Sequence, residues 1–351
     1  MAAWGDFHSV NGAGWSLFWR LPDEGGGLQI WWADFQGKRV LWKASQPFAI
    51  VPYHFPLPAG AQPGPPESTF KDGLGAQCEG APFTPLKQNA PNADLNGDAS
   101  WEAVNDTQAV EVHVEPGGSF GPEVLVVIEA KFQCGWYQYV HRWSFDSYGQ
   151  FDADLGMGGA VNPGAPRAAH VHHMYFRIDL DIDGFSSDAF EVFNHKNFDD
   201  NTGGDAWSKP IPKQGKFKLK PASARKFRVR DLTSALPDVK CTRSYEIEIP
   251  ALAGTDTHST ADVWATVYRG DNVEQGADVS CFDTKLDTYA TGPFDTNNGS
   301  DIVLWVVVRH HHEPRNEAEE RNFLPYHYEG FHIVPRAFAA LKGDRNGGRH
   351  G

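Results

Sequence analysis

The chain has 351 residues, of which 40% are hydrophobic, so it is long enough to bury a sizeable core within one large domain. Its formal net charge of −14 argues against nucleic acid as a partner, because binding to phosphate backbones needs an excess of Lys and Arg. The same charge argues against anionic membrane surfaces, and no stretch approaches the ~20 apolar residues that cross a bilayer. A small-molecule partner remains, and the acidic balance mildly favours a cationic one.

Short apolar or alternating runs between Gly- and Pro-rich turn signals predict an all-β fold. The predicted strands, in chain order, are Leu28–Phe35, Arg39–Lys43, Val124–Gln133, His172–Ile182, Tyr245–Ile249, Asp262–Tyr268 and Ile302–Arg309. The dipeptide Gln36-Gly37 predicts a hairpin turn between the first two. Long loops are expected at Pro56–Pro66, Gly80–Ala99 and Lys196–Ala224, and a short helix at Glu317–Arg321.

The beginning of the chain and its four cysteines bear on the compartment. The first twenty residues lack a basic start followed by an apolar run, which predicts no signal peptide and a cytoplasmic location. The cysteines form no Cys-x-x-Cys pair, which argues against a cysteine zinc site. Both free buried thiols and disulfides stay open for them.

In the segment from His170 to Asp183, apolar and polar side chains alternate along most of the predicted strand. Because alternate residues of a strand share a face, His170 and His172 fall on the face that continues with apolar residues. Burying an imidazole there without a partner is costly, and two imidazoles at i and i+2 can chelate one metal. The alternatives are hydrogen-bonded core histidines, or histidines in the loop before the strand.

A second strand, which begins after Asp301, also ends in histidines. His310 and His312 share a face with the apolar residues of this strand. Imidazole ligands suit copper or zinc better than magnesium or calcium. Two strands that carry histidines on their apolar faces therefore favour a single transition-metal site.

Several segments, in the same order along the chain, resemble the copper amine oxidase family. The run HVHHMYFRIDLDIDG is similar to the family's His-x-His segment, and DIVLWVVVRHHHEPRNE to its His-x-Pro segment, a register that selects His312 over His310. The segment GWYQYVHRWSF is similar to the one whose tyrosine becomes topaquinone, which places Tyr137 at the precursor position. Three further matching segments end at Tyr53, Tyr268 and Pro335.

The resemblance runs from about residue 14 to residue 338 and implies a single domain over residues 1–351 with the family's large β-sandwich, or supersandwich. It covers the family's catalytic domain and not its smaller N-terminal domains, and it implies a homodimer. The copper ligands that it implies are His170, His172 and His312. It also implies a peripheral calcium or sodium site, whose ligands are Asp179, the carbonyl of Leu180, Asp181, Asp301 and the carbonyl of Ile302.

The activity that the resemblance implies is oxidative deamination of a primary amine by dioxygen, which yields an aldehyde, ammonia and hydrogen peroxide. Topaquinone derived from Tyr137 would be the cofactor, Asp72 the base that removes a substrate proton, and Tyr53 a hydrogen-bond partner of the cofactor. Asp72 precedes Gly73, so a turn aspartate is its alternative, and core packing is the alternative for Tyr53.

The neighbours of Tyr137 depart from the family pattern. Trp136 and Gln138 stand where the family has Asn and an acidic residue. Two other hypotheses therefore stay open: a copper oxidase or oxygenase with an unmodified Tyr137 that acts on a specialised metabolite or peptide, and a non-catalytic copper-binding homologue.

Overall fold

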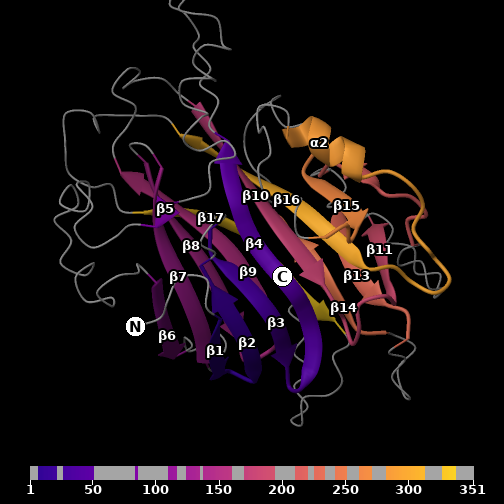
Figure 1. Ribbon diagram of the computed structural model, residues 1–351, viewed down its shortest axis with the longest axis horizontal. Coiled ribbons are helices and arrows are strands. Elements are labelled where there is room, and N and C mark those ends of the chain that lie inside the picture. Colours follow the sequence, from indigo (N-terminus) through magenta and orange to yellow (C-terminus); the bar gives the residue numbers. More distant parts are fainter. Residues whose placement is uncertain are drawn as a thin grey trace, which may run out of the picture.

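The protein is a β-sandwich of two large antiparallel sheets (Figure 1). The computed structural model describes residues 7–21, 27–50, 84–85, 110–116, 124–134, 137–159, 170–193, 210–219, 225–233, 242–250, 261–270, 282–312 and 326–336. Within these residues, one sheet has eight strands in the order β1-β2-β3-β4-β10-β16-β15-β12. The other has nine, in the order β11-β13-β14-β17-β9-β8-β7-β5, with β6 also paired to β7.

The strands of the eight-stranded sheet are β1 (His8–Gly12), β2 (Trp15–Arg20), β3 (Gln29–Phe35), β4 (Lys38–Ile50), β10 (His170–Leu180), β12 (Gly215–Phe217), β15 (Val263–Val267) and β16 (Ile302–His312). Those of the nine-stranded sheet are β5 (Thr84–Pro85), β6 (Val110–Pro116), β7 (Val124–Cys134), β8 (Tyr137–Asp146), β9 (Phe151–Gly159), β11 (Asp188–Phe193), β13 (Lys226–Asp231), β14 (Ser244–Glu248) and β17 (His327–Arg336). One helix, α2 (Phe282–Tyr289), lies among the described residues.

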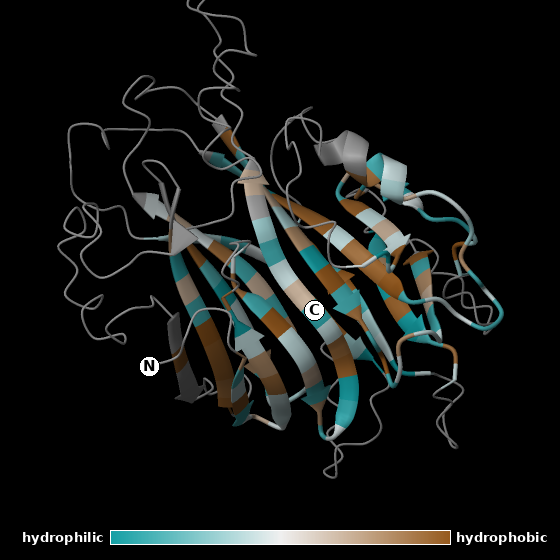
Figure 2. Ribbon diagram, in the orientation of Figure 1, coloured by the Kyte–Doolittle hydropathy of each residue, from teal (hydrophilic) through white to brown (hydrophobic). Residues whose placement is uncertain are grey.

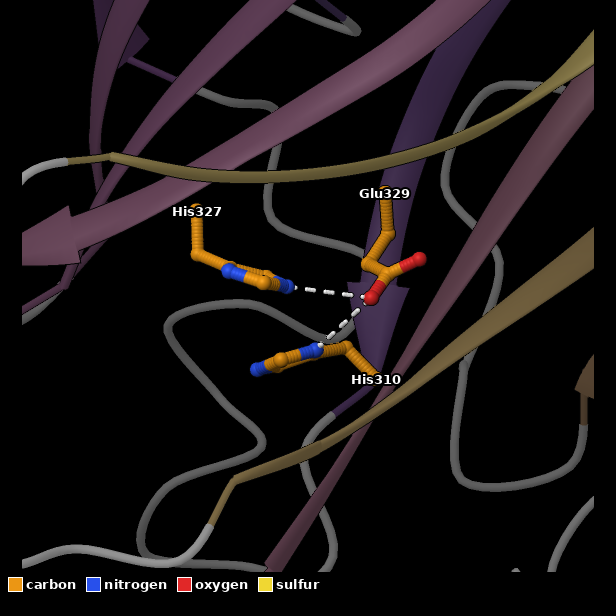
Figure 3. A group of neighbouring side chains, drawn as sticks. All are labelled: His310, His327 and Glu329. Atoms are coloured by element: carbon orange, nitrogen blue, oxygen red, sulfur yellow. Dashed lines mark hydrogen bonds and ion pairs between the residues drawn. The ribbon is translucent and has the colours of Figure 1, made fainter. Parts of the chain in front are cut away.

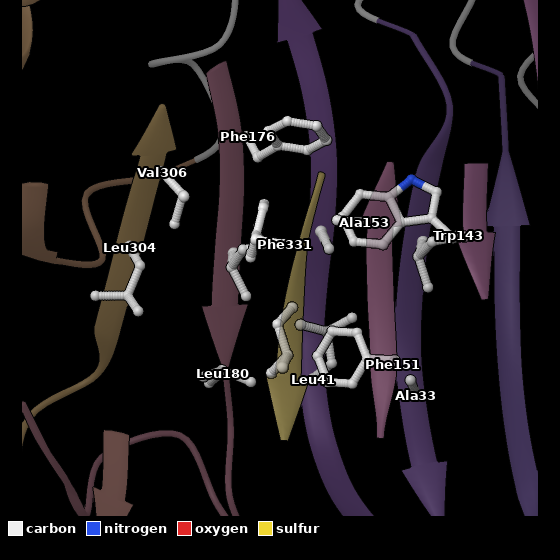
Figure 4. Close-up of a cluster of buried hydrophobic side chains, with 14 of the residues drawn as sticks. Ala33, Leu41, Trp143, Phe151, Ala153, Phe176, Leu180, Leu304, Val306 and Phe331 are labelled. Carbon is white, nitrogen blue, oxygen red and sulfur yellow. The ribbon is translucent and has the colours of Figure 1, made fainter. Parts of the chain in front are cut away.

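The main core fills the space between the two sheets (Figure 4). Phe176 of β10 meets Trp143 of β8 and Phe331 of β17 edge to face, with ring centroids 6.3 and 5.1 Å apart. Alternation explains how the strands supply this layer, because the inward residues of β10 from Met174 to Leu180 and of β16 from Ile302 to Val308 are apolar and face the opposite sheet. Hydrophobic residues accordingly lie along strands such as β7 and β16 (Figure 2).

Part of the outer face of the eight-stranded sheet, at β10, β15 and β16, is covered as well. Tyr175, Trp264 and Trp305 form a second buried cluster with Leu286 of α2. The indole Nε1 of Trp264 donates a hydrogen bond to Asp287 of the same helix at 2.9 Å. Strands β10 and β16 are therefore buried on both faces, which holds them rigidly in register.

The structure confirms the all-β sandwich and the predicted strands, with most ends within three residues, although β4 continues to Ile50, seven residues beyond the predicted end at Lys43. The predicted hairpin is also confirmed, since Gln36 and Gly37 both have positive φ, at 50° and 73°, and Phe35 pairs with Lys38. No described helix is long and apolar enough to cross a bilayer.

Two predicted loops contain short strands that the sequence pattern did not indicate. Strand β12 lies within Lys196–Ala224 and pairs with β15 at the edge of its sheet, and β5 lies within Gly80–Ala99 and pairs with β7. Such brief edge strands carry too few residues for an alternating pattern to be recognisable. The predicted loop Pro56–Pro66 and the predicted helix Glu317–Arg321 lie outside the described residues.

Candidate metal centre

At one end of the sandwich, the apolar inner faces of both sheets give way to polar side chains. In β16 the inward positions run through Leu304, Val306 and Val308 and then reach His310. In β17 they run outward from the buried Phe331 to Glu329 and His327. Polar groups from both sheets therefore line the same end of the interior.

The register of β10 and β16 brings the predicted copper ligands together along the backbone. His170 is paired directly with His312, and His172 with His310. The side chains of His170 and His312 lie outside the described residues, so the structure gives their strand positions only. The backbones of the three predicted ligands thus lie close together on β10 and β16, although His312 is far from the other two in the sequence.

His172 is the predicted ligand whose side chain is described, and it is buried. Its Nδ1 lies 3.1 Å from the hydroxyl oxygen of Tyr139, which comes from β8 in the opposite sheet. A neutral imidazole that carries its proton on Nδ1 donates it to this oxygen, which leaves the lone pair of Nε2 available to a metal. The two sheets therefore share an interaction that orients this imidazole.

The same register places Tyr137 at this end of the sandwich. In β8, Tyr139 pairs with Met157 and Tyr137 with Gly159, and Met157 pairs in turn with His327 of β17. Tyr137 lies two residues beyond Tyr139 in the same strand, so its backbone is on the side of the histidine rows. Its side chain lies outside the described residues.

A second group at this end consists of His310, His327 and Glu329 (Figure 3). Oε1 of Glu329 lies 3.0 Å from Nε2 of His327 and 3.4 Å from Nδ1 of His310. The two imidazole rings are 4.5 Å apart, and the rings of His310 and His172 are 6.2 Å apart. This group therefore adjoins the predicted copper ligands.

The predicted peripheral cation ligands also meet. The carboxylates of Asp179, Asp181 and Asp301 can each place an oxygen within 4.8 Å of the other two, and Leu180 pairs with Ile302 in the β10–β16 register. Burial raises the pKa of Asp181 to about 7, with the charge of Asp179 as the next cause. Burial, followed by the charges of Asp179 and Asp181, raises the pKa of Asp301 to about 8.

Such a cluster is unfavourable when its carboxylates are ionised without a counter-charge. Oδ1 of Asp181 and Oδ1 of Asp301 lack a hydrogen-bond partner among the described residues. Arg177 pairs with Asp179 at 2.8 Å and offsets part of the negative charge. Oxygen ligands of this kind suit calcium or another hard cation.

Two predicted site residues, Tyr53 and Asp72, lie outside the described residues, as does Trp136. The sequence patterns did not indicate Tyr139, His327 and Glu329 as members of the site. The signal for the last two was His-x-Glu before the apolar positions Phe331 and Ile333, which is the same pattern that revealed His170 and His172. For Tyr139, no local pattern indicates a partner in another sheet.

The fold and the site define a β-sandwich protein that gathers histidines between its two sheets. Residues 122–345 match the family model "Copper amine oxidase, enzyme domain". The chain belongs to the copper amine oxidase family.

Similar proteins agree with this assignment. Primary amine oxidase 2 of Arabidopsis thaliana is 22% identical over 317 residues, which are 78% of this chain and 45% of that protein. The copper-containing benzylamine oxidase of Hansenula polymorpha has a TM-score of 0.64 and is 21% identical; the match covers 94% of this chain and 59% of that protein. An Aspergillus nidulans amine oxidase has a TM-score of 0.60 and is 14% identical; the match covers 93% of this chain and 51% of that protein. The chain thus spans about half the length of these relatives.

Proposed function

We propose that the protein is a copper-dependent oxidase that deaminates a primary amine to an aldehyde, with ammonia and hydrogen peroxide as the other products. Dioxygen would be the oxidant, and water would supply the oxygen of the aldehyde. The observation that carries this proposal is the register that sets His170 opposite His312 and His172 opposite His310, while β8 brings Tyr139 to His172 and Tyr137 to the same end.

The donor set fits copper. His172 is an imidazole held in a buried setting, with Nδ1 bonded to Tyr139, and a metal would bind its Nε2. His170 and His312 occupy the paired positions beside it and would complete the ligand set. A quinone derived from Tyr137 would supply the electron sink for amine oxidation when present.

The remaining roles concern protons, orientation and stability. Asp72 would accept the substrate proton, and Tyr53 would orient the cofactor through a hydrogen bond. A cation among Asp179, Asp181 and Asp301 would neutralise buried negative charge and stabilise β10 and β16. A homodimer, a single domain over residues 1–351 and a cytoplasmic location complete the proposal.

A second candidate function keeps copper and leaves Tyr137 unmodified, with copper and dioxygen acting directly on a specialised metabolite or peptide. Trp136 and Gln138 favour it, because in the sequence a bulky tryptophan directly precedes the tyrosine that must be modified and a neutral amide follows it in place of an acid. A non-catalytic copper-binding homologue is the third.

Three measurements on one preparation separate these candidates. We expect about one copper per chain, a positive quinone stain, and hydrogen peroxide released on addition of a primary amine. Copper with turnover but no quinone would select the second candidate. Copper with neither quinone nor turnover would select the third, and failure of His172→Ala to reduce bound copper would reject the copper site itself.

A further inference from the structure

We propose that His310, His327 and Glu329 form a second transition-metal site, for zinc or a related divalent ion, beside the histidines assigned to copper. The proposal concerns residues outside the copper ligand set, and it does not require the protein to be an amine oxidase. It begins from the convergence of three ligand atoms drawn from two strands of opposite sheets (Figure 3).

Strand geometry explains why the three side chains converge. His327 and Glu329 are at i and i+2 of β17, so they share the inward face that continues with Phe331. His310 reaches the same space from β16, on the face that continues with Val308. A chelating pair on one strand and a third ligand on another is an arrangement that fixes a metal site on rigid elements.

The spacing suits a tetrahedral ion. Ligands that bind zinc at ~2.0–2.1 Å lie roughly 3.3–3.4 Å from one another. Oε1 of Glu329 is 3.4 Å from Nδ1 of His310 and 3.0 Å from Nε2 of His327, and all three ligand atoms lie within 4.8 Å of one another. The two distances to the carboxylate oxygen of Glu329 are thus already close to those of a tetrahedral site.

The chemistry of the set also favours a metal of this class. Imidazole is a borderline ligand, and two imidazoles with one carboxylate suit zinc, cobalt or copper better than calcium or magnesium. The side chain of His327 is 60% exposed, while those of His310 and Glu329 are 17% and 25% exposed, so an ion can enter from solvent and keep a water ligand. The charge of Glu329 offsets part of the ion's charge.

The alternative for this group is a carboxylate that accepts hydrogen bonds from two imidazoles and binds no metal. Equilibrium dialysis of the metal-free full-length chain against zinc distinguishes the two, because it counts bound ions. Cobalt serves as a spectroscopic probe, since tetrahedral cobalt absorbs strongly in the visible range. We expect His327→Ala to bind one equivalent fewer than the wild type and Glu329→Gln to bind it more weakly.

His332→Ala is the matched control. His332 lies on the same strand and is half exposed, but it is on the outer face, where Nδ1 is 2.8 Å from Oδ1 of Asp152. This variant should keep the full count and the tetrahedral cobalt spectrum. Because removing an outer-shell partner already costs about 10–100-fold in metal affinity, loss of the ligand His327 should exceed about 10²-fold.

The result that overturns the proposal is an equal zinc count and affinity in wild type and His327→Ala, or equal losses in His327→Ala and His332→Ala. The melting temperature of each variant is measured first, and Glu329→Gln replaces His327→Ala if the latter fails to fold. His172→Ala tests the copper site separately, because it should remove a different equivalent. The two metal sites can therefore be confirmed or rejected independently of each other.

Discussion

The hydroxyl of Tyr139 provides a direct test of how the two sheets cooperate at the metal centre. In Tyr139→Phe the ring remains, and the bond to Nδ1 of His172 at 3.1 Å is lost. Loss of one buried hydrogen bond should lower the free energy of unfolding by about 0.5–1.5 kcal/mol. Loss of an outer-shell partner should weaken copper binding by about 10–100-fold, which equals roughly 1.4–2.7 kcal/mol.

Tyr245→Phe is the control, because Tyr245 is also fully buried and donates a hydrogen bond to the carbonyl of Gly149 at 3.0 Å, away from the histidines. Denaturant unfolding should show similar losses of stability in both variants. Competition with a copper chelator should show weakened copper binding in Tyr139→Phe alone. Equal copper affinities in the two variants would refute the orienting role of Tyr139.

Three further predictions address the base, the cation and the core. Asp72→Asn should retain copper and any quinone while turnover falls by at least ~10²-fold in a peroxide assay, and normal turnover would assign the proton to another group. Chelation of calcium should lower the melting temperature of the wild type but not of Asp181→Asn, because calcium at about 100 times its Kd stabilises the folded state by about 2.7 kcal/mol. An unchanged melting temperature of the wild type would reject the cation site. In denaturant unfolding, Leu304→Ala should lower the free energy of unfolding by about 2–5 kcal/mol, because Leu304 is buried in the core. The control Val112→Ala, at an exposed position, should change it by no more than about 0.5 kcal/mol. Similar losses in the two variants would contradict the assigned core.

The strands around the histidines were predictable because their patterns are long. In β10, eleven residues alternate, and in β16 a continuous apolar run ends in histidines, so both the strand and the inward face follow from the sequence. The Gln36-Gly37 turn was predictable because a short hairpin needs positive φ at both positions.

Features that depend on distant partners were not predictable. The bond between Tyr139 and His172 joins strands of different sheets, and the bond between His310 and Glu329 joins β16 to β17 across the sandwich. Trp32 has a φ of 49° beside a register shift in β3, a conformation that a bulky residue adopts only where surrounding packing imposes it. Nothing in the local sequence indicates any of these.

The oxidation state of Tyr137 tests the proposed function most directly. The measurement is mass spectrometry of the peptide that contains Tyr137, from protein prepared in air with and without copper. The proposal predicts a copper-dependent gain of oxygen on Tyr137, with a visible absorption that phenylhydrazine shifts. An unmodified Tyr137 in copper-loaded, aerobic protein would contradict it and leave direct copper–dioxygen chemistry or no catalysis.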